Sequence, residues 1–131
     1  MEYILDACVL ISYILGEKEA LKVKDLLFNL DNTFYLNYSN YGEVIFTLGK
    51  KDLSESILNQ IKDNLKNYLG LEFLKTDNFE TVEIAAKYKI NGGLSYFDAL
   101  ILASSKIHDL KIITKDSEFK KFTKDFDILF L

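Results

Sequence analysis

The sequence predicts an α/β protein, a three-layer α/β/α sandwich around a central, mainly parallel five-stranded sheet. Two observations lead to this prediction. Short β-rich runs alternate with longer helical patterns along the 131 residues, as expected where parallel strands are joined by helices. Such connections are right-handed, which places helices on both faces of the sheet. The chain has no proline, no low-complexity linker and no internal repeat, so we expect residues 1–131 to form a single domain.

The expected strands are short runs rich in apolar, aromatic and β-branched residues. They cover residues 3–5, 33–36, 71–74, 112–113 and 128–131. We expect the first of them to lie in the centre of the sheet.

The expected helices are longer and carry apolar residues at helical spacing. They cover residues 9–15, 18–30, 41–48, 53–69, 79–88 and 96–108, with a brief helix at residues 117–122. Glycine marks several boundaries, at Gly16, Gly49, Gly70 and the Gly92-Gly93 pair, as it often does at the end of a helix.

The composition is that of a soluble globular protein, with 49% hydrophobic and 27% charged residues. No run of 18 apolar residues and no export signal is visible, and the single cysteine, Cys8, cannot form an internal disulfide. We therefore expect a cytoplasmic protein with no membrane association. The net charge of −4, with sixteen lysines and no arginine, lacks the basic footprint of most nucleic-acid binders. Lysines do gather locally, at residues 50, 51, 115, 120, 121 and 124.

Two acids lie shortly after predicted strands. Asp6 comes after residues 3–5, and Asp116 comes after Ile113-Thr114-Lys115. Each could simply cap the helix that follows, because an aspartate side chain accepts hydrogen bonds from free helical N–H groups. At either position taken alone, capping is the commoner role.

Two further acids lie near predicted helix starts. Glu43 stands three residues after Asn40, a spacing that resembles a capping box. Asp98 stands three residues after Ser95, in an apolar segment that we expect to be substantially buried. These acids too have an ordinary structural interpretation when each is considered alone.

The combination of the four acids changes their interpretation. In a doubly wound sheet, the carboxyl ends of strands and the amino ends of the following helices share one edge, where ligands bind. Carboxylates crowded there repel one another and have raised pKa values unless a cation neutralises them. Mg²⁺ and Mn²⁺ prefer carboxylate and water oxygens. The sequence therefore predicts a metal site at this edge.

The ordered set of motifs resembles the PIN-domain family, especially the VapC-type toxins of prokaryotic toxin–antitoxin modules. The matching segments are Leu-Asp-Ala-Cys-Val-Leu from residue 5, Asn-Tyr-Gly-Glu-Val from residue 40, Leu-Ser-Tyr-Phe-Asp-Ala-Leu-Ile-Leu-Ala from residue 94 and Ile-Ile-Thr-Lys-Asp-Ser-Glu-Phe from residue 112. They occur in the family's order and cover essentially the whole chain. Each segment alone is weakly specific, whereas the ordered set is strong.

The resemblance implies a set of site residues. The family's metal-binding and catalytic acids fall on Asp6, Glu43, Asp98 and Asp116. Ser95 and Thr114 match positions that could support these acids. Cys8 stands where the family often has a small polar residue, so a polar contribution from this position is in doubt; we interpret it as a small hydrophobic residue.

The resemblance also implies an activity. We expect an endoribonuclease that hydrolyses RNA with Mg²⁺ or Mn²⁺, acting as the toxin of a type II pair, with a cognate antitoxin and a homodimeric assembly. The tyrosines at positions 38, 41 and 96 could stack on RNA bases, although closing the edge of the core is their commoner role.

Several alternatives stay open or are disfavoured. One is a PIN nuclease of general RNA processing, and another is a non-catalytic partner-binding module whose acids only cap helices. A haloacid-dehalogenase-like phosphatase needs an aspartate where Cys8 stands. A response-regulator receiver needs an early acidic pair, whereas Asp6 stands alone.

Overall fold

A sheet of five parallel strands lies at the centre of the protein in the order β3-β2-β1-β4-β5. The computed structural model describes the whole chain, Met1–Leu131. The strands are β1 (Glu2–Leu5), β2 (Thr33–Asn37), β3 (Glu72–Leu74), β4 (Lys111–Thr114) and β5 (Ile128–Phe130). The predicted five-stranded parallel sheet, with the first strand at its centre, is confirmed.

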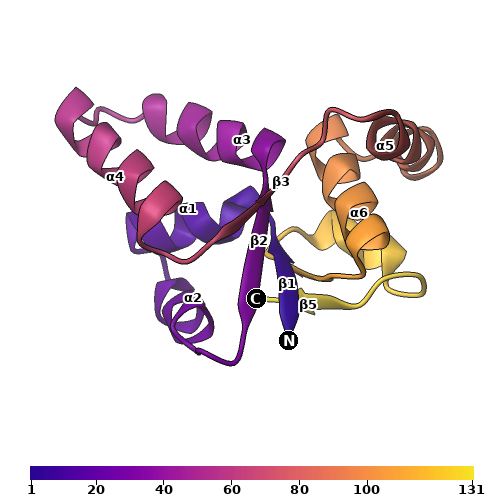
Figure 1. The fold of residues 1–131 in the computed structure, drawn as a ribbon, viewed down its shortest axis with the longest axis horizontal. Coiled ribbons are helices and arrows are strands. Elements are labelled where there is room, and N and C mark those ends of the chain that lie inside the picture. The colour runs from indigo at the N-terminus through magenta and orange to yellow at the C-terminus, as the bar shows by residue number, and fades with distance from the viewer.

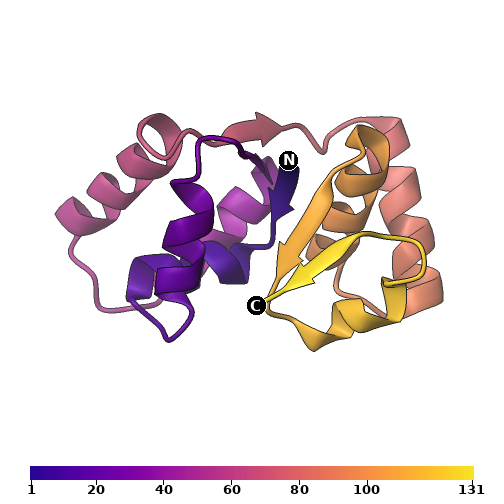
Figure 2. The same ribbon diagram turned by 90° about the horizontal axis from the view of Figure 1, so that it is seen from below.

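Helices cover both faces of this sheet (Figures 1 and 2). They are α1 (Ala7–Leu15), α2 (Ala20–Leu27), α3 (Tyr38–Gly49), α4 (Glu55–Asn67), α5 (Phe79–Gly92), α6 (Tyr96–His108) and the short 3-10 helix η1 (Ser117–Phe122). The first four lie on one side of the sheet, and α5, α6 and η1 lie on the other. This is the predicted three-layer sandwich. None of the helices is long and apolar enough to cross a membrane.

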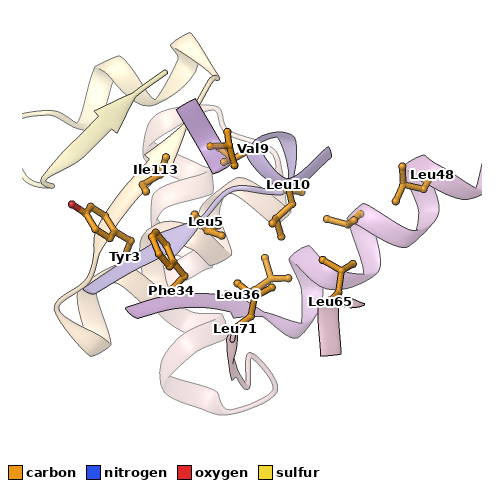
Figure 3. Close-up of a cluster of buried hydrophobic side chains, with 13 residues drawn as sticks. Tyr3, Leu5, Val9, Leu10, Phe34, Leu36, Leu48, Leu65, Leu71 and Ile113 are labelled. Carbon is orange, nitrogen blue, oxygen red and sulfur yellow. The ribbon is translucent and has the colours of Figure 1, made fainter. Parts of the chain in front are cut away.

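Each face of the sheet has its own hydrophobic core, because side chains alternate between the two faces along a strand. Leu5 belongs to the core under α1–α4, whereas Ile4 belongs to the core under α6 and η1. The same alternation separates Ile113 from Ile112. Figure 3 shows the first of these cores, in which side chains from three strands meet those of α1, α3 and α4.

Some predicted helix boundaries are wrong. α3 begins at Tyr38 rather than residue 41, because Asn37 caps it and Asn40 lies inside the helix. α2 is shorter than predicted, with bounds 20–27 instead of 18–30. α5 continues to Gly92 rather than ending at residue 88. Gly93 caps its C-terminus in the left-handed conformation, with a φ of 66°. Glycine at position 92 leaves room for the ring of Phe122, with which a Cβ there would collide.

Candidate functional site

Four acidic residues are placed along the carboxyl edge of the sheet. Asp6 directly follows the central strand β1, and Asp116 follows the neighbouring β4 by two residues. Glu43 lies in α3, which starts at the end of β2, and Asp98 lies in the first turn of α6. Because β2 and β4 flank β1, the four acids come from segments that meet at one place.

Asp6 is buried, with 4% of its surface exposed, and its side chain is held by two donors. The Thr114 hydroxyl donates to Asp6 Oδ2 at 2.7 Å, and the Cys8 thiol donates to the same oxygen at 3.2 Å. Burial raises the pKa of the Cys8 thiol to about 12, and the charge of Asp6 adds to this shift. The thiol therefore keeps its proton and acts as a weak donor. Cys8 packs against the hydrophobic core as expected, and its thiol also makes a polar contact with Asp6 that was not expected.

Asp116 is connected to Asp6 through one hydroxyl group. Its backbone N–H donates to Thr114 Oγ1 at 2.9 Å, and the same Thr114 hydroxyl donates to Asp6. The Asp116 side chain accepts from the N–H of Glu118 at 2.9 Å and so caps η1. Thr114 is buried, so it fixes the ends of the two central strands relative to each other.

Glu43 and Asp98 project from helices rather than strand ends. Both are partly buried, and one oxygen of Glu43, Oε2, is buried without a hydrogen-bond partner. Ser95 caps α6 by accepting from the N–H of Asp98 at 3.2 Å. An unpartnered buried carboxylate oxygen is unusual in a folded protein, and it marks a place where a donor or a cation is expected.

The acids influence one another electrostatically. Burial raises the pKa of Asp6, and the charge of Asp116 raises it further, against the bonds from Thr114 and Cys8. Burial and then the charge of Asp6 raise the pKa of Glu43. The same two causes raise the pKa of Asp98 to about 7, with smaller contributions from Asp116 and Glu43. Each of the four predicted acids thus lies within electrostatic range of at least two others.

The alternative interpretation of the acids as helix caps holds for only one of them. Asp6 occupies the N-cap position of α1 without a side-chain capping bond. Glu43 caps nothing, because Asn37 rather than Asn40 begins α3. Asp98 receives no helix N–H, since Ser95 caps α6. Asp116 alone serves as a cap. Capping therefore does not explain why these acids gather at one edge.

The donor chemistry of this edge fits a hard divalent cation, although the spacing is loose. As the side chains stand, no three histidine, cysteine, aspartate or glutamate side chains form a group that could hold a metal ion. Crowded carboxylates with raised pKa values and the unpartnered Glu43 Oε2 are what a cation would stabilise. Carboxylate oxygens suit magnesium or manganese. The residues fit such an ion in kind and in charge.

One lysine that the sequence places in a basic cluster is directed inward. Lys115 Nζ donates to Ser12 Oγ at 2.6 Å and pairs with Glu19 Oε2 at 3.1 Å. Burial opposes the ionisation of Glu19, but Lys115 outweighs it and lowers the pKa of that carboxyl group. Lys121 donates to the carbonyl of Gly92. Of the cluster near the C-terminus, Lys120 and Lys124 are exposed and make no ion pair within 4.0 Å.

The three tyrosines near the acids differ in exposure. Tyr41 is half-buried and meets Phe73 edge to face, with ring centroids 5.8 Å apart. Tyr38 is 54% exposed and stacks on Phe73 with one face, at 5.7 Å. Tyr96 is 41% exposed and forms no aromatic pair. Closing the edge of the core accounts for Tyr41, whereas Tyr38 and Tyr96 present ring surface to solvent.

Comparison with known proteins identifies relatives of this fold. The sequence model of the PIN domain matches residues 3–125. A toxin–antitoxin complex from Klebsiella pneumoniae contains a chain of 19% identity, with 97% of this chain and 95% of that chain covered and a TM-score of 0.73. FitAcB from Neisseria gonorrhoeae matches at 23% identity, coverage of 98% and 96%, and a TM-score of 0.72. VapC20 from Mycobacterium tuberculosis, described as a toxin that cleaves the sarcin–ricin loop, matches at 12% identity, 95% coverage of both chains and a TM-score of 0.76. No curated protein sequence is detectably similar.

Proposed function

This chain belongs to the PIN-domain family, and on that premise we propose that it is a divalent-metal-dependent endoribonuclease, the toxin of a type II toxin–antitoxin pair. The observation that carries the proposal is the convergence of four mutually repelling carboxylates at the carboxyl edge of the sheet. We include in the proposal that residues 1–131 form one nuclease domain.

The proposed site assigns a role to each acid. Asp6 lies at the centre, with Asp98 and Asp116 beside it, as the ligands of Mg²⁺ or Mn²⁺. Glu43 binds through water or orients the attacking water, which its unpartnered oxygen leaves it free to do. A bound divalent cation supplies charge neutralisation for the phosphate and activation of water. Thr114 and Ser95 hold the acids through the contacts described above.

RNA is supported as the substrate by the surroundings of the acids. Single-stranded RNA is commonly bound by stacking bases on aromatic rings, and the exposed Tyr38 and Tyr96 are the first residues of α3 and α6, the helices that carry Glu43 and Asp98. Lys120 and Lys124 are free to contact phosphates. The VapC20 relative is described as a toxin that cleaves an RNA loop. Because the net charge is −4, we expect modest affinity from charge alone.

An antitoxin partner and a homodimer complete the proposal. Structural neighbours include toxin–antitoxin complexes from Klebsiella pneumoniae and Salmonella typhimurium. The surface carries an apolar groove of about 600 Å³ beside α1, α2 and α4. Seven of its eight lining residues are hydrophobic, among them Ile14, Phe28 and Leu69, so it suits the apolar face of a partner. We expect the protein to act in the cytoplasm.

The test is cleavage of a mixed pool of structured RNAs by the purified protein. We expect cutting with Mn²⁺ or Mg²⁺, none with excess chelator, and a loss of more than about 100-fold in Asp6→Asn and Asp98→Asn, since even a partner outside the ligand set is worth about 10–100-fold. Both variants should keep the fold. Metal-dependent cutting retained in both would reject this site, and no cutting together with no Mn²⁺ binding would favour a partner-binding module.

A further inference from the structure

A buried polar network links the acid-bearing segments beneath the site. Asn37, the last residue of β2, is completely buried, as is Asn40 in the first turn of α3. Asn37 Oδ1 accepts from the N–H of Asn40 at 2.7 Å, and Asn37 Nδ2 donates to Ser104 Oγ at 3.4 Å. Ser104 lies in α6 and is 2% exposed. The network therefore connects α3 with α6.

The same network reaches the central strand. Asn40 Nδ2 donates to the carbonyl oxygen of Leu5 at 3.5 Å, and Leu5 directly precedes Asp6. The pairing of β1 with β2 runs only as far as Ile4↔Tyr35. Beyond that point the Asn40 side chain provides the connection between the two segments. Asn40 Oδ1 has no partner, so this buried amide is retained at a cost that ordinary core packing does not explain.

Other caps in the same molecule show what helix capping alone requires. Ser54, Asn78 and Ser95 cap α4, α5 and α6 with one side-chain oxygen each, and all three are exposed. Among the side-chain caps of the α-helices, only Asn37 is completely buried and bonded to a second helix. A serine would cap α3 as well as asparagine does. The hydrogen bond from Asn37 Nδ2 to Ser104 is therefore not needed for capping.

We propose that Asn37 and Asn40 are positioning residues that set the distances of Glu43 and Asp98 from Asp6 by bridging α3 to α6 and to the end of β1. This inference rests on the proposed metal-dependent function. Partners outside the ligand set of a metal site orient the ligands, and their loss commonly weakens metal binding about 10–100-fold. Asn37 and Asn40 act one step further out, because they bond the segments that carry Asp6, Glu43 and Asp98 rather than the acids themselves.

The test compares two identical substitutions by calorimetric titration of Mn²⁺ into the chelator-treated protein. Asn37→Ser keeps the cap oxygen but removes the amide arm to Ser104, and we expect Mn²⁺ binding to weaken about 10-fold or more. Asn78→Ser makes the same change in an exposed cap, and its affinity should stay within about twofold of wild type. RNA cleavage by Asn37→Ser should show a lower kcat with little change in KM.

Ser104→Ala is the second variant, in case Asn37→Ser impairs folding. It removes one hydroxyl group and leaves every helix cap in place. Its Mn²⁺ affinity should also fall. The double variant Asn37→Ser/Ser104→Ala should bind Mn²⁺ no more weakly than Asn37→Ser, since both substitutions remove the same hydrogen bond. Unchanged affinity in folded Asn37→Ser and Ser104→Ala would overturn the positioning role alone. Absence of Mn²⁺ binding in the wild type would overturn the proposed function and the positioning role together.

Discussion

The two edges of the sheet both carry many charges but arrange them in opposite ways. At the carboxyl edge, like charges crowd together and the pKa of Asp98 rises to about 7 through burial and its acidic neighbours. At the amino edge, three lysines and four acids line an open hollow of about 920 Å³. There, opposite charges meet, as in the pair of Lys111 with Asp127 at 3.5 Å. The hollow at the amino edge thus mixes both signs of charge, whereas the cluster at the carboxyl edge brings together acids alone.

This contrast shows that unbalanced charge identifies the candidate site better than the size of a depression does. Folding tolerates repulsion between carboxylates only where something else, here a cation, offsets it. An exposed pair such as Lys111–Asp127 contributes little and demands no ligand. The two edges therefore provide matched positions at which the same substitution should have different effects.

The largest contrast is expected for buried hydroxyl groups. Thr114→Val removes the group that donates to Asp6 and accepts from Asp116, and we expect Mn²⁺ affinity and RNA cleavage to fall about 10–100-fold. Ser105→Ala removes a buried hydroxyl that bonds the carbonyl of Leu110 at the amino edge. It should lower stability and leave Mn²⁺ affinity unchanged. Equal Mn²⁺ affinities in the two variants, measured by calorimetry, would show that the hydroxyl group of Thr114 does not support the metal site.

A second contrast concerns pH. Asp98 has a higher pKa in the folded protein, about 7 against 3.8, so the folded state holds this proton longer than the unfolded state does. Stability of the metal-free protein should therefore fall as the pH rises from about 4 to about 7, and the raised pKa values of Asp6 and Glu43 act in the same direction. The full shift of Asp98 corresponds to about 4 kcal/mol, which its partial exposure reduces to roughly 2 kcal/mol.

Urea unfolding at pH 5 and pH 8 measures this effect. Asp98→Asn should remove much of the pH dependence, and so should saturating Mn²⁺ at pH 8. Asp127→Asn, at the amino edge, should leave the dependence as it is in the wild type. If the metal-free wild type is as stable at pH 8 as at pH 5, burial and the acidic neighbours do not raise the pKa values at the carboxyl edge.

The smallest contrast is between two lysines. Lys115 is held by Ser12 and the largely buried Glu19, whereas Lys111 pairs with Asp127, whose side chain is 70% exposed. Lys115→Met should lower the melting temperature by about 3–8 °C, because it leaves the largely buried Glu19 with only the exposed Lys18 as its ion-pair partner. Lys111→Met should lower it by less than about 2 °C. Similar melting temperatures for the two variants would show that the inward position of Lys115 carries no stability.

The sheet and the four acids could be predicted from the sequence, because both follow from local patterns. Alternating strand and helix signals predict a parallel sheet, and acids that follow strand ends or begin the next helices lie at its carboxyl edge. The resemblance to the PIN-domain family singled out the four acids from the others. The resemblance also indicated Thr114 and Ser95 as supporting residues, but the sequence did not show which atoms each of them contacts. Thr114 meets Asp6 across 108 residues of sequence, and Asn37 meets Ser104 across 67. No periodicity encodes such pairs.

The error at the start of α3 has a similar origin. Asn37 and Asn40 are both good capping residues, and the spacing of Asn40 from Glu43 favoured the wrong one. Burial of Asn37 between the strand and α6 decides between them, which only the tertiary structure reveals. A second asparagine three residues earlier, directly after an apolar strand, is the one signal in the sequence that could have indicated the cap.

The most direct test of the central claim is calorimetric titration of Mn²⁺ into the metal-free wild type and two single variants. One variant neutralises an aspartate at the amino edge, and the other neutralises an aspartate at the carboxyl edge. Wild type and Asp127→Asn should bind Mn²⁺ with the same affinity, whereas Asp6→Asn should bind it more than about 100-fold more weakly. That result would place the metal site among the crowded carboxylates. Equal binding by Asp6→Asn and wild type, or weaker binding by Asp127→Asn, would contradict the account.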